Sequence, residues 1–204
     1  MGRGIATRLV SGGHNVTIMD RQPDKAKSLA EQIAVNAKKG VKVQGVAFGS
    51  PIKDEIVILA IPYSATGEVI ETLGIQLAGK TIIDITNPLN ATYDGLMVAP
   101  GTSAAEEIAR KLPANTKVFK AFNTTFAMTL VAGQVDNKPL DVFIAGNDAA
   151  AKTKVVQLVN DGGLRAIDAG LLERARQLEA MGLWGITLQG TLGTGFQSAW
   201  KIVS

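Results

Sequence analysis

Residues 1–20 read MGRGIATRLVSGGHNVTIMD, and three patterns follow one another within this short stretch. Apolar side chains recur at helical spacing from residue 2 to residue 10, and the pair Gly12-Gly13 predicts the end of that helix. Residues 16–19 predict a short buried strand, which ends at Asp20. A helix, a strand and a terminal carboxylate in this order are typical of the first half of a nucleotide-binding α/β domain.

The glycines of the opening helix match the end of a dinucleotide-binding loop. In such domains a first strand leads into G-x-G-x-x-G, whose third glycine allows close packing of the helix, and an acidic residue follows about 20 residues later. Gly2 fits the third glycine, Arg3 lies in the first turn, and Asp20 fits the acidic residue. The first strand and the two earlier glycines are missing, so we expect that this sequence starts one strand late. The alternative is that residues 196–203 fill the gap, although their alternating pattern suits an edge strand better.

The rest of the chain alternates predicted strands and helices, which predicts an α/β fold with a doubly wound, mostly parallel sheet of the Rossmann type. Further strands are predicted at residues 41–46, 56–61, 81–85, 118–122, 142–145, 164–167 and 196–203. Helices are predicted at residues 23–38, 62–73, 103–112, 149–159 and 171–188. We expect one domain over residues 1–204, with residues from about 170 onward serving dimerisation or an acceptor site.

The composition excludes several classes of site. The chain has no cysteine and one histidine, His14, which excludes disulfides, thiolate metal sites and histidine clusters. Its longest apolar stretch, residues 56–62, is too short to span a membrane, and no signal peptide is visible, so a cytoplasmic location is expected. The net charge of +3 is too small to indicate nucleic-acid binding.

Polar residues follow three successive predicted strands at positions where a ligand is expected. Ligands of open α/β sheets lie beyond the carboxyl ends of the strands, and the residues found there are Pro62, Thr86, Asn87, Pro88, Asn123 and Thr124. The choice of cofactor stays open from these residues alone. Asp20 favours NAD because a carboxylate binds the ribose hydroxyls, whereas Arg21 and Lys25 could hold the 2′-phosphate of NADP.

Several motifs occur together in one order: residues 1–6 (MGRGIA), 60–63 (AIPY), 84–89 (DITNPL), 120–124 (KAFNT), 145–148 (AGND) and 168–181 (DAG…ARxLExM). Together they resemble the coenzyme F-420-dependent NADP oxidoreductase family, whose fold also forms the cytosolic domain of the STEAP metalloreductases. The resemblance implies a homodimer that binds NADP(H) and exchanges hydride with a deazaflavin or flavin. It also implies that Arg21 and Lys25 contact the 2′-phosphate and that Ile61, Pro62 and Tyr63 line the nicotinamide half. Asp20 departs from the small polar residue of the archaeal reductases.

The predicted function is therefore hydride transfer between a nicotinamide dinucleotide and a flavin-like acceptor, which needs orientation by the protein and no acid–base residue. The alternatives are a dinucleotide sensor without activity and an imine or ketone reductase that uses Tyr63, Lys120 or Tyr93 as proton donor. We expect Lys120, which lies in a predicted strand, to point outward. In the helix at 171–188, Gly182 and Gly185 predict a close backbone approach, with Trp184 as a candidate wall of a flat pocket.

Overall fold

The computed structural model describes residues 1–203 of the chain. Its strands are β1 Val16–Asp20, β2 Val43–Ala47, β3 Ile56–Leu59, β4 Thr81–Asp84, β5 Lys117–Lys120, β6 Gln134–Val135, β7 Lys138–Pro139, β8 Asp141–Gly146 and β9 Arg165–Gly170. Its α-helices are α1 Gly2–Gly12, α2 Pro23–Ala34, α3 Thr66–Leu73, α4 Ala104–Lys111, α5 Ala127–Ala132, α6 Ala149–Asp161 and α7 Ala175–Leu192. Short 3-10 helices lie at residues 63–65 before α3, at 74–77 after α3 and at 172–174 before α7.

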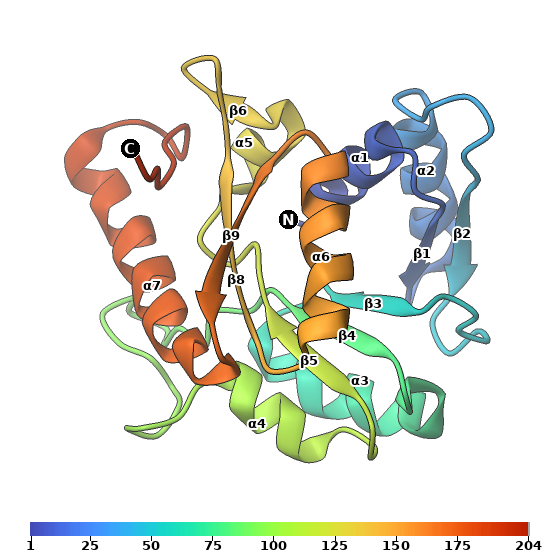
Figure 1. The fold of residues 1–204 in the computed structure, drawn as a ribbon, viewed down its shortest axis with the longest axis horizontal. Helices are drawn as coiled ribbons and strands as arrows, with labels where there is room; N and C mark the ends of the chain where they lie inside the picture. Colours follow the sequence, from blue (N-terminus) through green and yellow to red (C-terminus); the bar gives the residue numbers. More distant parts are fainter. Residues whose placement is uncertain (204) are drawn as a thin grey trace.

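The strands form a mostly parallel sheet in two parts, as Figure 1 shows. β1 and β2 pair in parallel, and the larger part has the order β3-β4-β5-β8-β9. β3, β4 and β5 are parallel, β8 runs antiparallel to β5, and β9 is parallel to β8. Among residues 1–203, no strand pairs with both β1 and β3. The predicted α/β class and mostly parallel sheet are confirmed.

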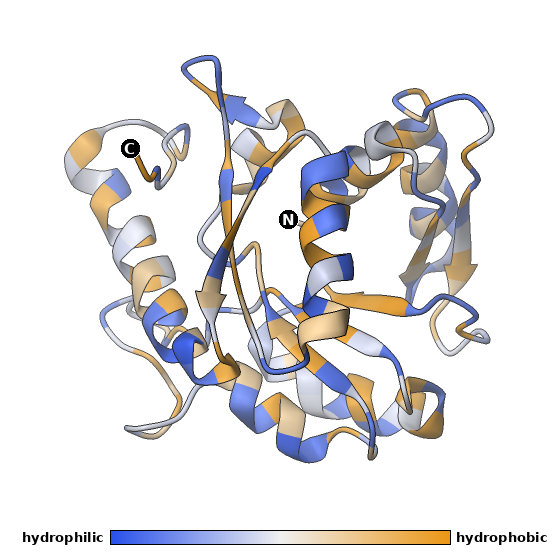
Figure 2. Ribbon diagram, in the orientation of Figure 1, coloured by the Kyte–Doolittle hydropathy of each residue, from blue (hydrophilic) through white to orange (hydrophobic). Residues whose placement is uncertain are grey.

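Helices cover both faces of the larger sheet, because successive residues of each strand point to opposite sides. Ile83 and Phe119 belong to a core that α1, α5 and α6 complete, whereas Ile82 and Val118 belong to a second core under α3 and α4. The apolar colour of β3 in Figure 2 is typical of a parallel strand that is covered on both faces. The small sheet packs on α2 and α1, where Ile33 lies at the centre of a third apolar cluster.

The structure corrects the prediction of a final strand. Residues 196–203 form no strand and do not lie between β1 and β3. Gly193 and Gly195 have positive φ angles, and the amide of Ile202 donates to the carboxylate of Asp141 at the start of β8 instead of joining a ladder. The prediction also missed α5 and the β6–β7 hairpin, which are short elements with weak periodic patterns.

The opening helix packs through its glycines. A Cβ on Gly4 would lie 2.7 Å from the Cβ of Leu130 in α5, and a Cβ on Gly2 would lie 3.2 Å from the Cβ of Ala60. Ala60 directly follows β3, so the first turn of α1 lies at the carboxyl end of the parallel strands. This is where the amide groups of a helix start can meet a pyrophosphate.

The close contact at Gly4 predicts a measurable cost for a single methyl group. Gly4→Ala should lower the free energy of unfolding by about 1–3 kcal/mol, since α1 and α5 must separate to admit it. Urea unfolding followed by circular dichroism measures this change. Gly67→Ala in α3 is the matched control, because a Cβ there meets nothing within 4 Å. An equal loss of stability in both variants would contradict the close contact between α1 and α5.

Candidate functional site

The carboxyl ends of β3, β4 and β5 bring the predicted site residues to one edge of the sheet. The strands are in register, with Leu59 opposite Asp84 and Asp84 opposite Lys120. The segments that follow the three strands therefore start side by side: residues 60–63, 85–88 and 121–125. The parallel register explains why motifs far apart in the sequence meet here.

Two asparagines join the ends of β4 and β5. Asn87 Nδ2 donates to the backbone oxygen of Asn123 at 2.9 Å, and Asn123 Nδ2 donates to Asn87 Oδ1 at 2.9 Å and to Leu178 O at 2.8 Å. Phe122, with a φ of 62°, turns the chain after β5 so that Asn123 can make these bonds. The side chains of Asn87 and Asn123 are here called the amide pair. A Cβ on Gly182 would lie 2.4 Å from Asn87 Oδ1, so α7 can approach the amide pair only with glycine at this position. The predicted close approach at Gly182 is confirmed.

A cleft of about 410 Å³ opens beside the amide pair. Its lining is Met1, Ile85, Asn87, Asn123, Thr125, Phe126, Ala127, Met128, Ile186, Gly195 and Phe196. An apolar cleft with a few polar groups at the strand ends is typical of a cofactor or substrate site. A larger hollow of about 680 Å³ lies between α4 and the starts of β5 and α6, and none of the predicted site residues lines it.

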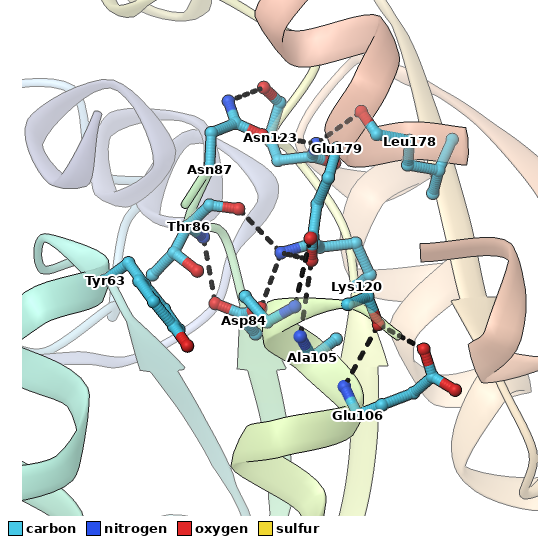
Figure 3. A network of polar contacts seen from close by, with 12 residues as sticks. Tyr63, Asp84, Thr86, Asn87, Ala105, Glu106, Lys120, Asn123, Leu178 and Glu179 are labelled. Atoms are coloured by element: carbon cyan, nitrogen blue, oxygen red, sulfur yellow. Dashed lines mark hydrogen bonds and ion pairs between the residues drawn. The ribbon is translucent and has the colours of Figure 1, made fainter. Parts of the chain in front are cut away.

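A buried ion cluster lies directly behind this edge (Figure 3). The ammonium group of Lys120 lies 2.6 Å from Asp84 Oδ2 and 2.8 Å from Glu179 Oε1, and all three side chains are fully buried. Lys120 also donates to the backbone oxygen of Thr86 at 2.6 Å. The prediction that Lys120 points outward is wrong, because its strand is covered on both faces and two carboxylates compensate its charge.

The cluster fixes the backbone at the start of the site. The Thr86 amide donates to Asp84 Oδ1 at 2.9 Å while its carbonyl accepts from Lys120, so both polar backbone atoms of Thr86 are held. Glu179 accepts from the amides of Ala104 and Ala105 at the first turn of α4. Burial raises the pKa of Glu179, and the adjacent Lys120 offsets part of this rise. The cluster thus ties β4, β5, α4 and α7 together beneath Asn87.

Tyr63 lies on the same edge with its hydroxyl committed to a carboxylate. The phenol donates to Glu107 of α4, and burial together with this bond raises the pKa of Tyr63 to about 12. Ile61 is half-buried and Pro62 is exposed, beside the short turn that precedes α3. Tyr63 is therefore a weak proton donor at neutral pH.

The remaining predicted residues lie at the end of β1 and on two helices. Asp20 Oδ1 accepts from the amide of Gln22 at 2.8 Å. Arg21 lies 2.8 Å from Glu68 and 5.9 Å above the ring of Phe48, and 57% of its side chain is exposed. Arg3 and Lys25 are exposed in the first turns of α1 and α2. Arg21 is thus held by Glu68 and by the ring of Phe48.

Comparison with known proteins identifies the family. The model of the family "NADP oxidoreductase coenzyme F420-dependent" matches residues 1–88. The F420-dependent NADP reductase of Methanocaldococcus jannaschii is 35% identical in an alignment of 195 positions that covers 88% of this chain and 83% of that protein. The chain belongs to the family of coenzyme F420-dependent NADP oxidoreductases. The resemblance seen in the ordered motifs is thereby confirmed.

Other proteins similar to this chain support its assignment to this oxidoreductase family. The metalloreductase STEAP3 of Rattus norvegicus is 34% identical over 89% of this chain and 34% of its own length. A crystal structure from Arthrobacter sp. FB24, assigned to the F420-dependent NADP reductases, superposes with a TM-score of 0.81 at 32% identity over 100% of this chain and 95% of that one. A pyrroline-5-carboxylate reductase from Coxiella burnetii, at 14% identity and a TM-score of 0.64, shares the fold alone.

Sequence reasoning missed the buried cluster although its members lie in the family motifs. Asp84, Lys120 and Glu179 belong to the segments DITNPL, KAFNT and ARxLExM. The alternation of each strand could have revealed the cluster. Asp84 and Lys120 lie two residues after Ile82 and Val118, so they point to the same buried face, and the register of β4 and β5 places them opposite each other. Within residues 1–203, no group of three or more histidine, cysteine or acidic residues is arranged to hold a metal ion. The same residues contain no helix long and apolar enough to cross a membrane.

Removal of the central lysine should be costly. Lys120→Met leaves two buried carboxylates without their counter-ion, so the free energy of unfolding should fall by about 3–5 kcal/mol. Chemical unfolding measures this change, and Lys120→Met combined with Glu179→Gln should lose less than the sum of the two single changes. Lys154→Met, which breaks the exposed ion pair with Glu55, should be nearly neutral. A similar loss from Lys154→Met and Lys120→Met would refute the role of the buried cluster.

Proposed function

We propose that this protein is an NADP-dependent oxidoreductase that moves hydride between NADP(H) and coenzyme F420 or a flavin-like ring. The observation that carries the proposal is the apolar cleft at the strand ends, next to the start of α1, in a chain of this family. In that reaction the nicotinamide carbon of NADPH would give a hydride to the ring of the acceptor, NADPH would become NADP⁺, and the reduced ring would take up one proton from solvent. The protein contributes binding, alignment and exclusion of water.

The residues at the strand ends fit a nicotinamide. Thr86 Oγ1, Asn123 Oδ1 and Thr124 Oγ1 are buried without a hydrogen-bond partner in the protein. Buried polar atoms without partners are rare and indicate a missing partner such as a ligand or water. Of these residues Asn123 lines the cleft, and a nicotinamide carboxamide, which has donors and an acceptor, can satisfy its unpaired oxygen. We assign Ile61, Pro62, Tyr63, Thr86, Asn87, Pro88 and Asn123 to this half of the cofactor.

The adenosine half lies at the end of β1 in this proposal. Arg21 and Lys25 bind the 2′-phosphate, Asp20 contacts the ribose, and the first turn of α1, with Gly2 and Arg3, faces the pyrophosphate. The ion pair between Arg21 and Glu68 is exposed on both sides and is therefore weak, so a phosphate can compete for the guanidinium.

We assign no acid–base residue to the chemical step. Tyr63, with a pKa of about 12, is bonded to Glu107, and Lys120 is enclosed by Asp84 and Glu179. A reductase of imines or ketones needs a proton donor beside the nicotinamide, whereas hydride transfer between two cofactors needs alignment only. Because Tyr63 and Lys120 are already bonded to carboxylates, hydride transfer between two cofactors is favoured over reduction of an imine or ketone.

We further propose that the protein is a cytoplasmic homodimer, in which the C-terminal part from about residue 170 contributes to the interface. Leu171, Trp184 and Leu192 are large apolar side chains, and more than half of each is exposed. Such a surface favours association with a second copy. Sedimentation analysis measures the mass in solution; a monomer at micromolar concentration would overturn this part of the proposal.

The activity itself is tested with the purified protein, NADPH and oxidised F420. Calorimetry should show saturable NADPH binding, and the absorbance of oxidised F420 should fall only when enzyme and NADPH are both present. FMN and FAD serve as alternative acceptors. NADPH binding without turnover of any of these acceptors would favour a dinucleotide sensor, and absence of NADPH binding would sink both readings.

Arg21 separates NADP from NAD in this proposal. Arg21→Ala should raise the dissociation constant of NADPH about tenfold or more, while that of NADH changes little, because only NADPH carries the 2′-phosphate. Calorimetry with both nucleotides measures the two constants. Lys27→Ala, an exposed lysine elsewhere on α2, is the matched control. Equal effects of Arg21→Ala on the two nucleotides would retire this role.

A further inference from the structure

The segment that follows α7 forms one wall of the cleft. Residues 193–203, here called the C-terminal strap, contain no helix or strand, yet Gly195 and Phe196 line the cleft opposite the amide pair. The rings of Phe196 and Phe126 meet edge to face, with centroids 5.3 Å apart and an interplanar angle of 82°. The two phenylalanines together form an aromatic corner of the cleft.

The strap is held in place by one buried side chain. Gln189 Oε1 accepts hydrogen bonds from Thr194 Oγ1 at 2.5 Å, from the amide of Phe196 at 3.2 Å and from Ser198 Oγ at 3.2 Å. Its Nε2 donates to Gly185 O at 2.8 Å, so the side chain that holds the strap is itself bonded to the preceding turn of α7. A buried amide that holds three groups of an irregular segment fixes that segment in one conformation.

A second anchor lies at the far end of the strap. The Asp141 carboxylate accepts from Lys201 Nζ at 2.6 Å and from the Ile202 amide at 2.8 Å, and Arg165 pairs with the same carboxylate. Burial alone would raise the pKa of Asp141, but these hydrogen bonds outweigh it and lower the pKa to about 2. The strap is therefore attached at both ends and is a fixed wall of the cleft.

Phe196 itself is in an unfavourable backbone conformation. Its φ is 63°, in the left-handed region that glycine and asparagine tolerate and aromatic residues rarely adopt. The ring gains little burial in return, since 43% of the residue is exposed. Strain of this kind persists where the surroundings enforce it, and it is concentrated at ligand sites. The strain here directs an aromatic ring toward the cleft.

We propose that Phe196 determines which ring systems the cleft accepts and that Gln189 is its positioning residue. The ligand is a flat conjugated ring, such as the deazaflavin of F420, that lies against Phe196 and Phe126 while NADPH occupies the strand ends. Aromatic rings in such edge or stacked contacts add to the affinity that burial alone provides. The inference rests on the proposed function, and the two can fail separately.

The first test changes the ring. Phe196→Ala should raise the KM for F420, and its dissociation constant, about tenfold, with the NADPH dissociation constant changed by less than about twofold. Phe196→Tyr keeps the ring and should stay close to the unsubstituted protein. F420 binding is followed by quenching of the tryptophan fluorescence, since Trp200 belongs to the strap and packs against Trp184 of α7, the second tryptophan of the chain.

The second test leaves the ring and removes its support. Gln189→Met deletes the bonds to Thr194, Phe196 and Ser198 and should weaken F420 binding in the same direction as Phe196→Ala, again without loss of NADPH affinity. Gln189→Glu keeps the accepting oxygen and should recover part of the affinity. Val203→Ala, at an exposed position of the same strap, is the matched control and should change neither constant.

The outcomes separate the inference from the proposed function. An F420 dissociation constant that is the same with and without Phe196, or absence of F420 binding to the unsubstituted protein, overturns the inference. A parallel rise of the NADPH constant in the Phe196 and Gln189 variants also overturns it, because that result shows a general loss of structure. Binding of F420 that depends on Phe196, without any hydride transfer, keeps the inference and refutes the proposed function.

Discussion

The compensated charge of Lys120 is the constraint on which the rest of the site depends. An ammonium group with no solvent contact requires counter-ions with good geometry, and here they come from β4 and from α7. Apolar residues of similar size would fill the same space but would not specify how the elements are placed. The ion cluster holds Thr86 through both of its backbone groups and orients the first turn of α4, so the strand ends and the helices have one relative arrangement.

Close backbone approaches complement this polar constraint. Gly146 in β8 leaves room for the ring of Phe119, where a Cβ would lie 2.1 Å from a ring carbon, and Gly45 lets β2 approach the backbone of Ala26 in α2. Gly182 does the same for α7 over Asn87. In each case the absence of a side chain lets a helix or a neighbouring ring approach a strand or the segment that follows it, and a single methyl group would push the two apart.

Much of the fold follows from the sequence, because apolar periodicity determines which segments are buried strands and which are amphipathic helices. Val16–Asp20 and Asp141–Gly146 are observed near their predicted positions, and the parallel order explains the shared edge of Asn87 and Asn123. The orientation of Lys120 was predicted wrongly because a charged side chain in a strand more often faces solvent than a buried counter-ion. Its partners Asp84 and Glu179 lie 36 and 59 positions away in the sequence, beyond any local pattern. The final strand was predicted from alternation alone, which residues 196–203 show although their backbone amides bond elsewhere.

The location of the cofactor residues on two parts of the sheet has a consequence for ligand binding. Val16 of β1 packs against the core that contains Ile83 and Phe119, and Met19 packs against the core that contains Leu59, so side-chain packing connects β1 to the larger sheet. Asp20 and Arg21 belong to the smaller part, whereas Asn87 and Asn123 belong to the larger one. A dinucleotide that contacts both parts needs them correctly placed relative to each other, so its binding would stabilise this one arrangement of β1 beside the larger sheet.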